Sequence, residues 1–343
     1  MATQTRQLVE LLSIEGLDVR VVQTNSPYSP AWVGKIKGIR ALFRLIPYFL
    51  KIWKLAGRVN VIHLMANSGW SWQLFSAPVV WIGWLRKTAV IVNYRGGEAE
   101  QYFRESIRWI APTMNKATEI VVPSLYLKDI FAKQNFKVTV IPNIVNFERF
   151  KLRAKNRENT SDEFRLIVTR NLEPIYGLST AIKSVAKAIK EVPNLKLLIA
   201  GSGPQKEELV TLVKELGLQE KVSFVGRLGP GEIELFYSEA DIMLNPTTVD
   251  NMPNSVLEAL ASGLPIITTN VGGIPYIVEH EKTALMVSMG DEQEMAKQII
   301  RLHKDEVLRQ SLVNSGLQEV AQYGWPEVKQ RWISTYQRLG KRA

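Results

Sequence analysis

Short apolar runs and longer amphipathic segments alternate along the first half of the 343-residue chain. Runs rich in Val and Ile favour strands, and apolar residues at helical spacing favour helices. The predicted strands are 19–23, 59–64, 89–93, 120–123 and 138–141, and the predicted helices are 5–14, 35–58 and 70–85. We interpret 70–85 as a buried helix, because it is shorter than the roughly 20 residues that span a bilayer. The alternation predicts an α/β fold, with a parallel sheet covered by helices.

The second half follows the same alternation, and the residues after its strands are informative. Ligands bind outside the carboxyl ends of strands in an open parallel sheet, so polar or glycine-bearing positions there are candidate site residues. Strands are expected to end at Thr169, Ala200, Phe224, Leu244 and Thr269, and the following positions include Arg170, Gly201, Val225, Asn245 and Asn270.

The length suits two domains of about 150 to 200 residues each. Residues 151–163 are charged and polar without an apolar period, which indicates a linker. We therefore predict an N-terminal domain at 1–150, a C-terminal domain at 164–324 and a terminal helix at 325–343, in which Pro326 takes a favourable first-turn position.

Residues 250–273 combine a loop, a short helix, a strand and a glycine pair, with Asp250 and Glu258 eight residues apart. Asn254 and Ser255 are candidate N-cap residues. The start of a helix offers unpaired N–H groups and about half a positive charge, which suits a diphosphate. Glu258, one turn inside the helix, could accept hydrogen bonds from sugar hydroxyls. The alternative is that this segment binds no ligand and is an ordinary helix-strand unit with a solvated acid at each end.

This segment resembles the signature of the retaining glycosyltransferases of family 4, in which two acids eight positions apart precede a helix and a Pro-led strand. The resemblance implies a GT-B fold, with two Rossmann-like domains facing a cleft and a terminal helix that crosses back to the first domain. It also implies that Glu258 holds the ribose of a nucleotide sugar and that Asp250 contacts the transferred sugar. The family has Glu at the first position, so the carboxylate of Asp250 must approach by about another 1.5 Å.

Arg170 occupies the place of the family's diphosphate-binding arginine, and its fixed charge and fork of donors suit a leaving diphosphate. The family usually has Lys where this chain has Tyr176, so one cation is missing. The resemblance makes Arg170 and Asp250 the catalytic candidates. It also implies that the donor binds along the strand ends and the helix start. The donor-binding candidates are Arg170, Gly201, Val225, Asn254, Ser255 and Glu258.

Arg95, Gly96 and Gly97 follow a predicted strand of the first domain, where the resemblance places the acceptor. They could bind acceptor anions, or they could form only a glycine turn. The resemblance also implies a first strand and a Gly-rich loop before the helix at 5–14, and this sequence shows neither. We expect an N-terminally short chain that is either a fragment or mis-started chain or a protein of impaired activity, and we favour the fragment.

The net charge of +10 is confined to the first half of the chain, and no acidic residue occurs between Asp18 and Glu98. Such a surface suggests an anionic partner. Nucleic-acid motifs are absent. In residues 35–58, basic side chains are interleaved with Ile, Leu, Phe and Trp, as in helices that lie on anionic membranes. The alternative is a helix that faces the protein core and whose charges are merely solvated.

The sequence offers no cofactor or metal site. It has no cysteine and no Asp-x-Asp pair, and the spacing of its three histidines suits no metal. We expect a retaining, metal-independent glycosyltransferase that moves sugar from a nucleotide diphosphate sugar, with UDP favoured over GDP, to a glycan or lipid-linked hydroxyl in cell-surface polysaccharide or glycolipid synthesis. The expected location is cytoplasmic, on the inner face of the membrane. A catalytically silent nucleotide-sugar-binding scaffold and a nucleotide-sugar epimerase remain open.

Overall fold

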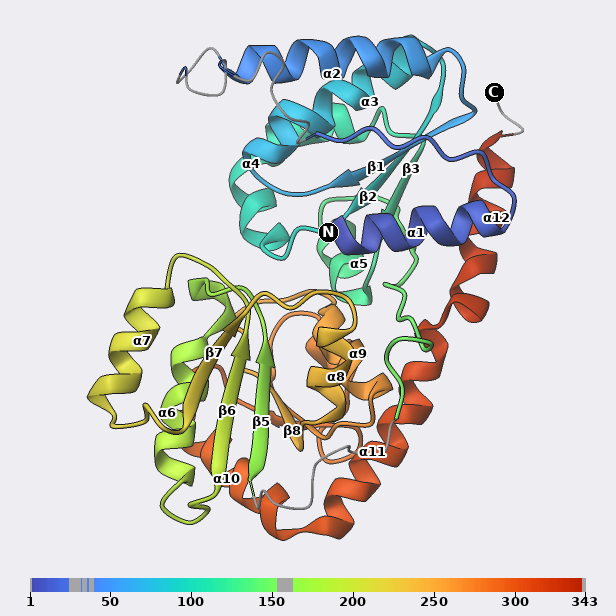
Figure 1. The fold of residues 1–343 in the computed structure, drawn as a ribbon. Helices are drawn as coiled ribbons and strands as arrows, with labels where there is room; N and C mark the ends of the chain where they lie inside the picture. Colours follow the sequence, from blue (N-terminus) through green and yellow to red (C-terminus); the bar gives the residue numbers. More distant parts are fainter. Residues whose placement is uncertain (1, 25–31, 33–35, 37–39, 153–162, 341–343) are drawn as a thin grey trace. The chain divides into compact units, whose positions relative to one another are not determined.

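The computed structural model describes residues 2–24, 32, 36, 40–152 and 163–340 (Figure 1). The chain forms two compact units. The first comprises Met1–Ile144 and Val328–Ala343, and the second comprises Val145–Glu327. The structure therefore counts residues 145–150 with the second unit, and it counts most of the terminal helix with the first. Most of the predicted linker lies outside the described residues.

The first unit contains a parallel sheet in the order β1-β2-β3-β4. Its strands are β1 Val61–Ala66, β2 Ala89–Tyr94, β3 Glu119–Val122 and β4 Thr139–Val140. Its helices are α1 Ala2–Ile14, α2 Arg40–Ala56, α3 Ala77–Leu85, α4 Ala99–Met114 and α5 Leu125–Ala132, and the π-helix Trp72–Ser76 leads into α3. Four of the five predicted strands are present within a few residues.

The predicted strand at 19–23 is wrong, because these residues form no strand. Val22 packs against the core of the unit, whereas Val21 is 48% exposed. The apolar residues at 19–23 therefore belong to a loop that packs Val22 against the core. A strand also needs a hydrogen-bonded neighbour, which a sequence pattern cannot supply.

The segment 70–85 is helical, but only part of it is buried. Trp72, Val79 and Val80 are fully buried, whereas Trp70 is 79% and Trp84 is 48% exposed. The prediction of a buried helix is thus correct for one face only. α3 packs against α2, α4 and β2, and its remaining side is exposed.

The second unit contains a six-stranded parallel sheet in the order β10-β9-β8-β5-β6-β7. Its strands are β5 Phe164–Thr169, β6 Leu195–Ala200, β7 Val222–Gly226, β8 Ile242–Asn245, β9 Ile266–Thr269 and β10 Leu285–Val287. The expected strand ends are correct for β5, β6 and β9. β7 continues two residues past Phe224, and β8 continues one residue past Leu244.

Helices cover both faces of this sheet (Figure 1). α6 Leu178–Ala188, α7 Lys206–Glu215 and α10 Glu292–Lys304 pack on one apolar core, and α8 Glu232–Ser238 and α9 Asn254–Ala261 pack on the other. α11 Glu306–Val320 follows α10 and contacts α9. The predicted fold class, two α/β domains with parallel sheets, is confirmed.

The terminal helix α12, Trp325–Gly340, begins in the second unit and continues in the first. Pro326 lies in its first turn, as predicted. Trp332 is buried, and its ring lies 4.8 Å from that of His63 on β1. The helix is therefore part of the core of the first unit.

Candidate functional site

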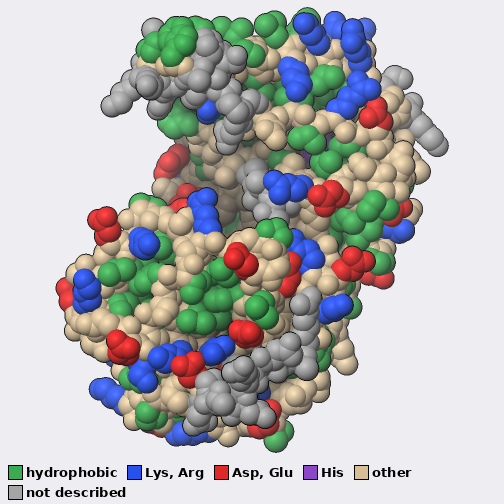
Figure 2. Space-filling model, in the orientation of Figure 1, with side chains coloured by type: hydrophobic (Ala, Val, Ile, Leu, Met, Phe, Trp, Pro, Cys, Tyr) green, Lys and Arg blue, Asp and Glu red, His purple; other side chains and the backbone are tan. Residues whose placement is uncertain are grey.

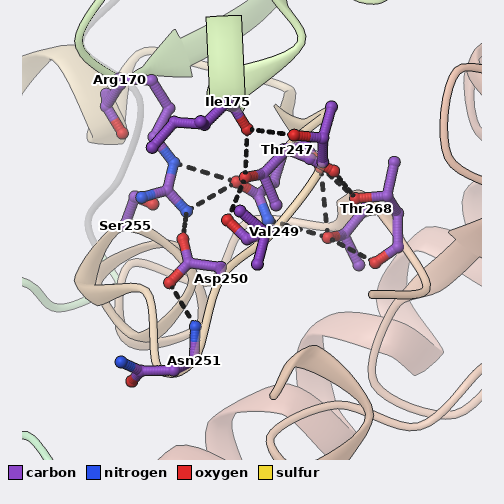
Figure 3. A network of polar contacts seen from close by, with 12 residues as sticks. Arg170, Ile175, Thr247, Val249, Asp250, Asn251, Ser255 and Thr268 are labelled. Atoms are coloured by element: carbon purple, nitrogen blue, oxygen red, sulfur yellow. Dashed lines mark hydrogen bonds and ion pairs between the residues drawn. The ribbon is translucent and has the colours of Figure 1, made fainter. Parts of the chain in front are cut away.

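Arg170 follows β5 directly and lies among polar groups from three other segments (Figure 3). Its Nε and Nη2 donate to Asn245 Oδ1 across 3.0 and 2.8 Å, and Nη2 also donates to Asp250 Oδ2 across 2.7 Å. The side chains of Arg170 and Asp250 are only 11% and 15% exposed. The structure thus brings together the two residues that the sequence suggested as catalytic.

Tyr176 lies beside this pair. The guanidinium carbon of Arg170 is 5.1 Å from the centre of its ring, which is within the range of a cation–π contact. Burial raises the pKa of the Tyr176 hydroxyl, so the ring stays neutral at physiological pH. Where the family usually has a second cation, this chain therefore has a neutral ring beside the first.

A glycine pair fixes the main chain around Asp250. Asp250 Oδ1 accepts a hydrogen bond from the N–H of Asn251, and the N–H of Gly273 donates to the Asp250 carbonyl, both across 2.8 Å. A Cβ on Gly272 would meet the Asp250 carbonyl, and one on Gly273 would meet the Asn251 carbonyl, well inside the 3.0 Å that real Cβ atoms keep. The sequence showed this pair after a strand but did not reveal which loop it would contact.

Helix α9 begins directly after Pro253, so Asn254 and Ser255 lie in its first turn. Their prediction as N-cap residues is wrong. Pro253 takes the extended cap conformation, and its carbonyl accepts a hydrogen bond from the N–H of Val256. Ser255 is 5% exposed, and its buried Oγ has no hydrogen-bond partner among the described residues. An unsatisfied buried hydroxyl costs about 1–3 kcal/mol, so a ligand that pairs with it would recover free energy.

Glu258 lies on α9 and accepts a hydrogen bond from the Tyr237 hydroxyl, 3.0 Å from its Oε2. Tyr237 comes from α8, is fully buried and also contacts Thr169 Oγ1 across 2.7 Å. Burial raises the pKa of Glu258, and the hydrogen bond from Tyr237 lowers it in part. Sequence reasoning missed Tyr237, because no local pattern connects it to an acid 21 residues away.

Gly201 and Gly203 bring the turn after β6 against the residues after β5. A Cβ on Gly201 would meet the Arg170 carbonyl, and one on Gly203 would meet the main chain of Leu172. The N–H of Gly201 donates to the Gly226 carbonyl across 2.7 Å. Val225 lies inside β7, near its carboxyl end, and is 40% exposed. These donor-binding candidates therefore lie along the carboxyl edge of neighbouring strands.

The acceptor candidates lie at the carboxyl end of β2 in the first unit. Arg95 donates from Nε to Asn93 Oδ1 across 3.2 Å and from Nη1 to Asn143 Oδ1 across 2.5 Å. Burial lowers the pKa of Arg95 to about 10. A Cβ on Gly96 would meet Ser68 Oγ, so the turn packs closely there, whereas Gly97 borders open space.

Asn93 connects Arg95 to a buried histidine. Because the Oδ1 of Asn93 accepts from Arg95, its Nδ2 donates to His63 Nε2, 2.9 Å away. His63 Nδ1 then carries the proton and donates to the Tyr336 hydroxyl of α12 across 2.5 Å. Burial and the charge of Arg95 lower the pKa of His63 to about 3, so the ring is neutral. His63 therefore joins β1 to α12 through a neutral, buried ring.

The part of the chain that the structure describes contains no cluster of three or more His, Cys, Asp or Glu side chains that could hold a metal ion. Nor does any helix in that part have the length and apolar character needed to cross a membrane.

Residues 148–319, half of the chain, match the family model described as glycosyl transferases group 1. The chain belongs to this family. The match contains Arg170, Asp250 and Glu258, together with all the polar contacts described around them.

Curated relatives match part of the chain. The chain is 30% identical over 200 residues to the N-acetyl-alpha-D-glucosaminyl L-malate synthase of Bacillus anthracis, which covers 58% of this chain and 50% of that protein. It is 35% identical over 147 residues to the lipopolysaccharide core biosynthesis glycosyltransferase LpsD of Rhizobium meliloti, covering 41% and 42%. The chain thus spans about half the length of the curated relatives it matches.

Solved structures resemble more of the chain. Anabaena HepE in complex with UDP has a TM-score of 0.74 at 17% identity, with 87% of this chain and 84% of that chain covered. A sucrose-phosphate synthase from Thermosynechococcus elongatus has a TM-score of 0.76 at 22% identity, covering 99% and 93%. At these identities the likeness concerns the fold, and the expected GT-B fold is confirmed.

Proposed function

We propose that this protein transfers a sugar from a nucleotide diphosphate sugar to a hydroxyl of a glycan or lipid-linked acceptor. The observation that carries the proposal is the polar cluster at the carboxyl edge of the second sheet. Arg170 supplies a fixed cation, and Ser255 on the first turn of α9 supplies a buried hydroxyl that lacks a partner. Both suit the phosphate oxygens of a donor, and Glu258 suits its ribose.

Departure of the diphosphate is the demanding step of such a transfer. Arg170 is held by Asn245 and Asp250, so it needs little reorganisation as negative charge develops on the leaving group. The start of α9 adds a partial positive charge through the helix dipole. These groups could stabilise the leaving diphosphate without a divalent cation. We also propose that the acceptor oxygen attacks the face that the diphosphate leaves, which retains the anomeric configuration.

We propose a UDP-sugar as the donor. The structure of HepE, which resembles this chain in fold, contains UDP. The structure of a pneumococcal O-GlcNAc transferase, which also resembles this chain in fold, contains UDP and GlcNAc. These two structures support a uridine nucleotide for the test, and they do not indicate which sugar is transferred.

We propose further that α2 holds the protein on an anionic membrane surface. Tyr48, Ile52 and Ala56 bury one side of the helix in the core. A second apolar stripe faces solvent on α2. It consists of Phe43, Ile46, Leu50 and Trp53, which are 44 to 57% exposed and recur at helical spacing.

Basic residues flank this stripe. Lys51 and Lys54 are exposed on α2, and the Arg86 guanidinium lies 5.2 Å from the ring of Trp53. Hydrophobic and basic side chains lie side by side over the upper part of the first unit (Figure 2). An apolar stripe edged by cations suits the interface of an anionic bilayer. Docking through this stripe would place the protein on the cytoplasmic face of the membrane, beside a lipid-linked acceptor. Residues 35 and 37–39 of the basic stretch lie outside the described residues.

A silent nucleotide-sugar-binding scaffold is the second candidate. It is favoured by two departures from the family, Asp250 and Tyr176, which both contact Arg170. Transfer of labelled sugar to a lipid extract would exclude the scaffold.

Calorimetric titration of UDP, GDP and dTDP into the purified chain tests the donor site. We expect one of these nucleotides, UDP, to bind and Glu258→Ala to abolish its binding, because the ribose then loses its carboxylate partner. The matched control is Glu279→Ala, which removes an exposed acid of the same unit. Failure of all three nucleotides to bind a folded wild-type chain at millimolar concentration would refute the donor site.

A further inference from the structure

The protein holds the guanidinium of Arg170 along one edge only. Nε and Nη2 share Asn245 Oδ1, and Nη2 also reaches Asp250 Oδ2. The described residues give Nη1 no hydrogen-bond partner. Because the guanidinium is planar and rigid, fixing one edge also fixes the direction in which the remaining N–H groups point.

Both carboxylate oxygens of Asp250 are already engaged. Oδ2 accepts from Arg170 at 2.7 Å, and Oδ1 accepts from the N–H of Asn251 at 2.8 Å. The bond to Arg170 joins two charges and is roughly twice as strong as a neutral hydrogen bond, so Asp250 contributes strongly to holding the guanidinium in place.

We propose that Asp250 is a positioning residue for Arg170. This inference rests on the proposed function, because it assigns to Arg170 the diphosphate of the donor. Asp250, Asn245 and the ring of Tyr176 surround the guanidinium, and Nη1 is the part left for a ligand. The residue that contacts Arg170 in this way is Asp250, at the position where the family has Glu.

Loss of the Asp250 charge has two opposite effects on diphosphate binding. It removes a negative charge near the phosphates, which would tighten binding. It also releases Arg170 from one of its holders, which would weaken binding. The sign of the change therefore distinguishes a positioning residue from a carboxylate that merely repels the ligand.

The experiment is a double-mutant cycle with UDP and uridine as probes. Calorimetry is run on the wild type, Asp250→Asn, Arg170→Gln and the double variant, with thermal unfolding to verify that each is folded. We expect Asp250→Asn to weaken UDP binding about 3- to 10-fold and to leave uridine binding unchanged. In the Arg170→Gln background the same substitution should no longer weaken UDP binding, because the loss of positioning passes through Arg170 and only the relief of charge repulsion remains.

Two further variants complete the design. Asp250→Glu keeps the charge and should stay closer to the wild type in UDP affinity than Asp250→Asn. Glu281→Gln breaks an exposed Arg–carboxylate pair with Arg301 in the same unit and should leave UDP binding unchanged.

Tighter UDP binding by Asp250→Asn, an unchanged affinity, or an equal loss in both backgrounds would each overturn the inference. In these cases the wild type still binds UDP, so the proposed function survives. If the folded wild type binds none of UDP, GDP and dTDP, the proposed function fails and the inference falls with it.

Discussion

The Tyr237 hydroxyl donates a hydrogen bond to Glu258 Oε2 across 3.0 Å and thereby joins α8 to α9 inside the second unit. The bond favours the carboxylate form of Glu258 and so opposes the rise in pKa that burial causes. Removing it with Tyr237→Phe should raise the pKa of Glu258 further. At neutral pH we expect UDP binding to weaken about 3- to 10-fold, the usual effect of one lost hydrogen bond.

The pH dependence gives the sharper test of the same variant. A ribose hydroxyl is best accepted by a carboxylate, so UDP affinity should fall as the pH drops through the pKa of Glu258. In Tyr237→Phe this fall should begin at a higher pH than in the wild type. Titrations between about pH 5 and pH 8 measure it. Tyr48→Phe, a buried tyrosine of the first unit, serves as control. Superimposable profiles would contradict the role given to Tyr237.

Ser255→Ala should separate stability from binding. Its hydroxyl is buried without a partner, so its removal should leave thermal stability unchanged or increase it. UDP binding should weaken several-fold, and uridine binding should not change. Ser184→Ala provides the opposite pattern, because Ser184 Oγ is buried on α6 and bonded to the Ala181 carbonyl. It should lower stability without affecting UDP. A Ser255→Ala protein that binds UDP normally would remove Ser255 from the site.

Gly273→Ala should disrupt the donor site without altering any polar side chain. The added Cβ would collide with the Asn251 carbonyl and displace the turn that carries Asp250. We expect a loss of about 1–3 kcal/mol in the free energy of unfolding and a marked loss of UDP affinity. Gly290→Ala is the control, since Gly290 has φ +75° but borders open space. It should cost stability and keep UDP affinity. Equal effects of both variants on UDP binding would argue against the packing role of Gly273.

Leu50→Glu should weaken membrane docking. The substitution places a negative charge in the exposed apolar stripe of α2 and leaves the buried side of the helix intact. Flotation with vesicles of phosphatidylglycerol and phosphatidylcholine measures the bound fraction. We expect the wild type to float, less so at high salt, and Leu50→Glu to stay in solution. Leu235→Glu, an equally apolar exposed position on α8, should float like the wild type. A wild type that does not float would end the membrane proposal.

The sequence predicted those parts of the fold and site that depend on local pattern. Buried strands such as β5 and β6 were found because their apolar runs end at a polar residue or a glycine. The acids Asp250 and Glu258 stood out through their spacing. Residues 19–23 have the composition of a strand but form a loop, because they have no hydrogen-bonded neighbouring strand. Asn254 and Ser255 have side chains that suit an N-cap, but Pro253 takes that position through its backbone conformation.

Contacts between distant segments were beyond prediction. Tyr237 reaches Glu258 only because α8 and α9 pack on the same face of the sheet. The place of Gly272 and Gly273 against Asp250 and Asn251 depends on how two loops after neighbouring strands approach each other. A glycine pair in a sequence indicates that a side chain would not fit at those positions. Only the fold shows which atoms it would collide with.

The two-sided character of α2 has a consequence for the protein in dilute buffer. Its outer stripe cannot turn inward, because the inner side is already packed with Tyr48 and Ile52. Without lipid, water must cover this stripe unless another molecule does. Self-association that grows with protein concentration, and that mild detergent reverses, is therefore the behaviour to expect during purification, and it would reflect a missing bilayer rather than a native oligomer.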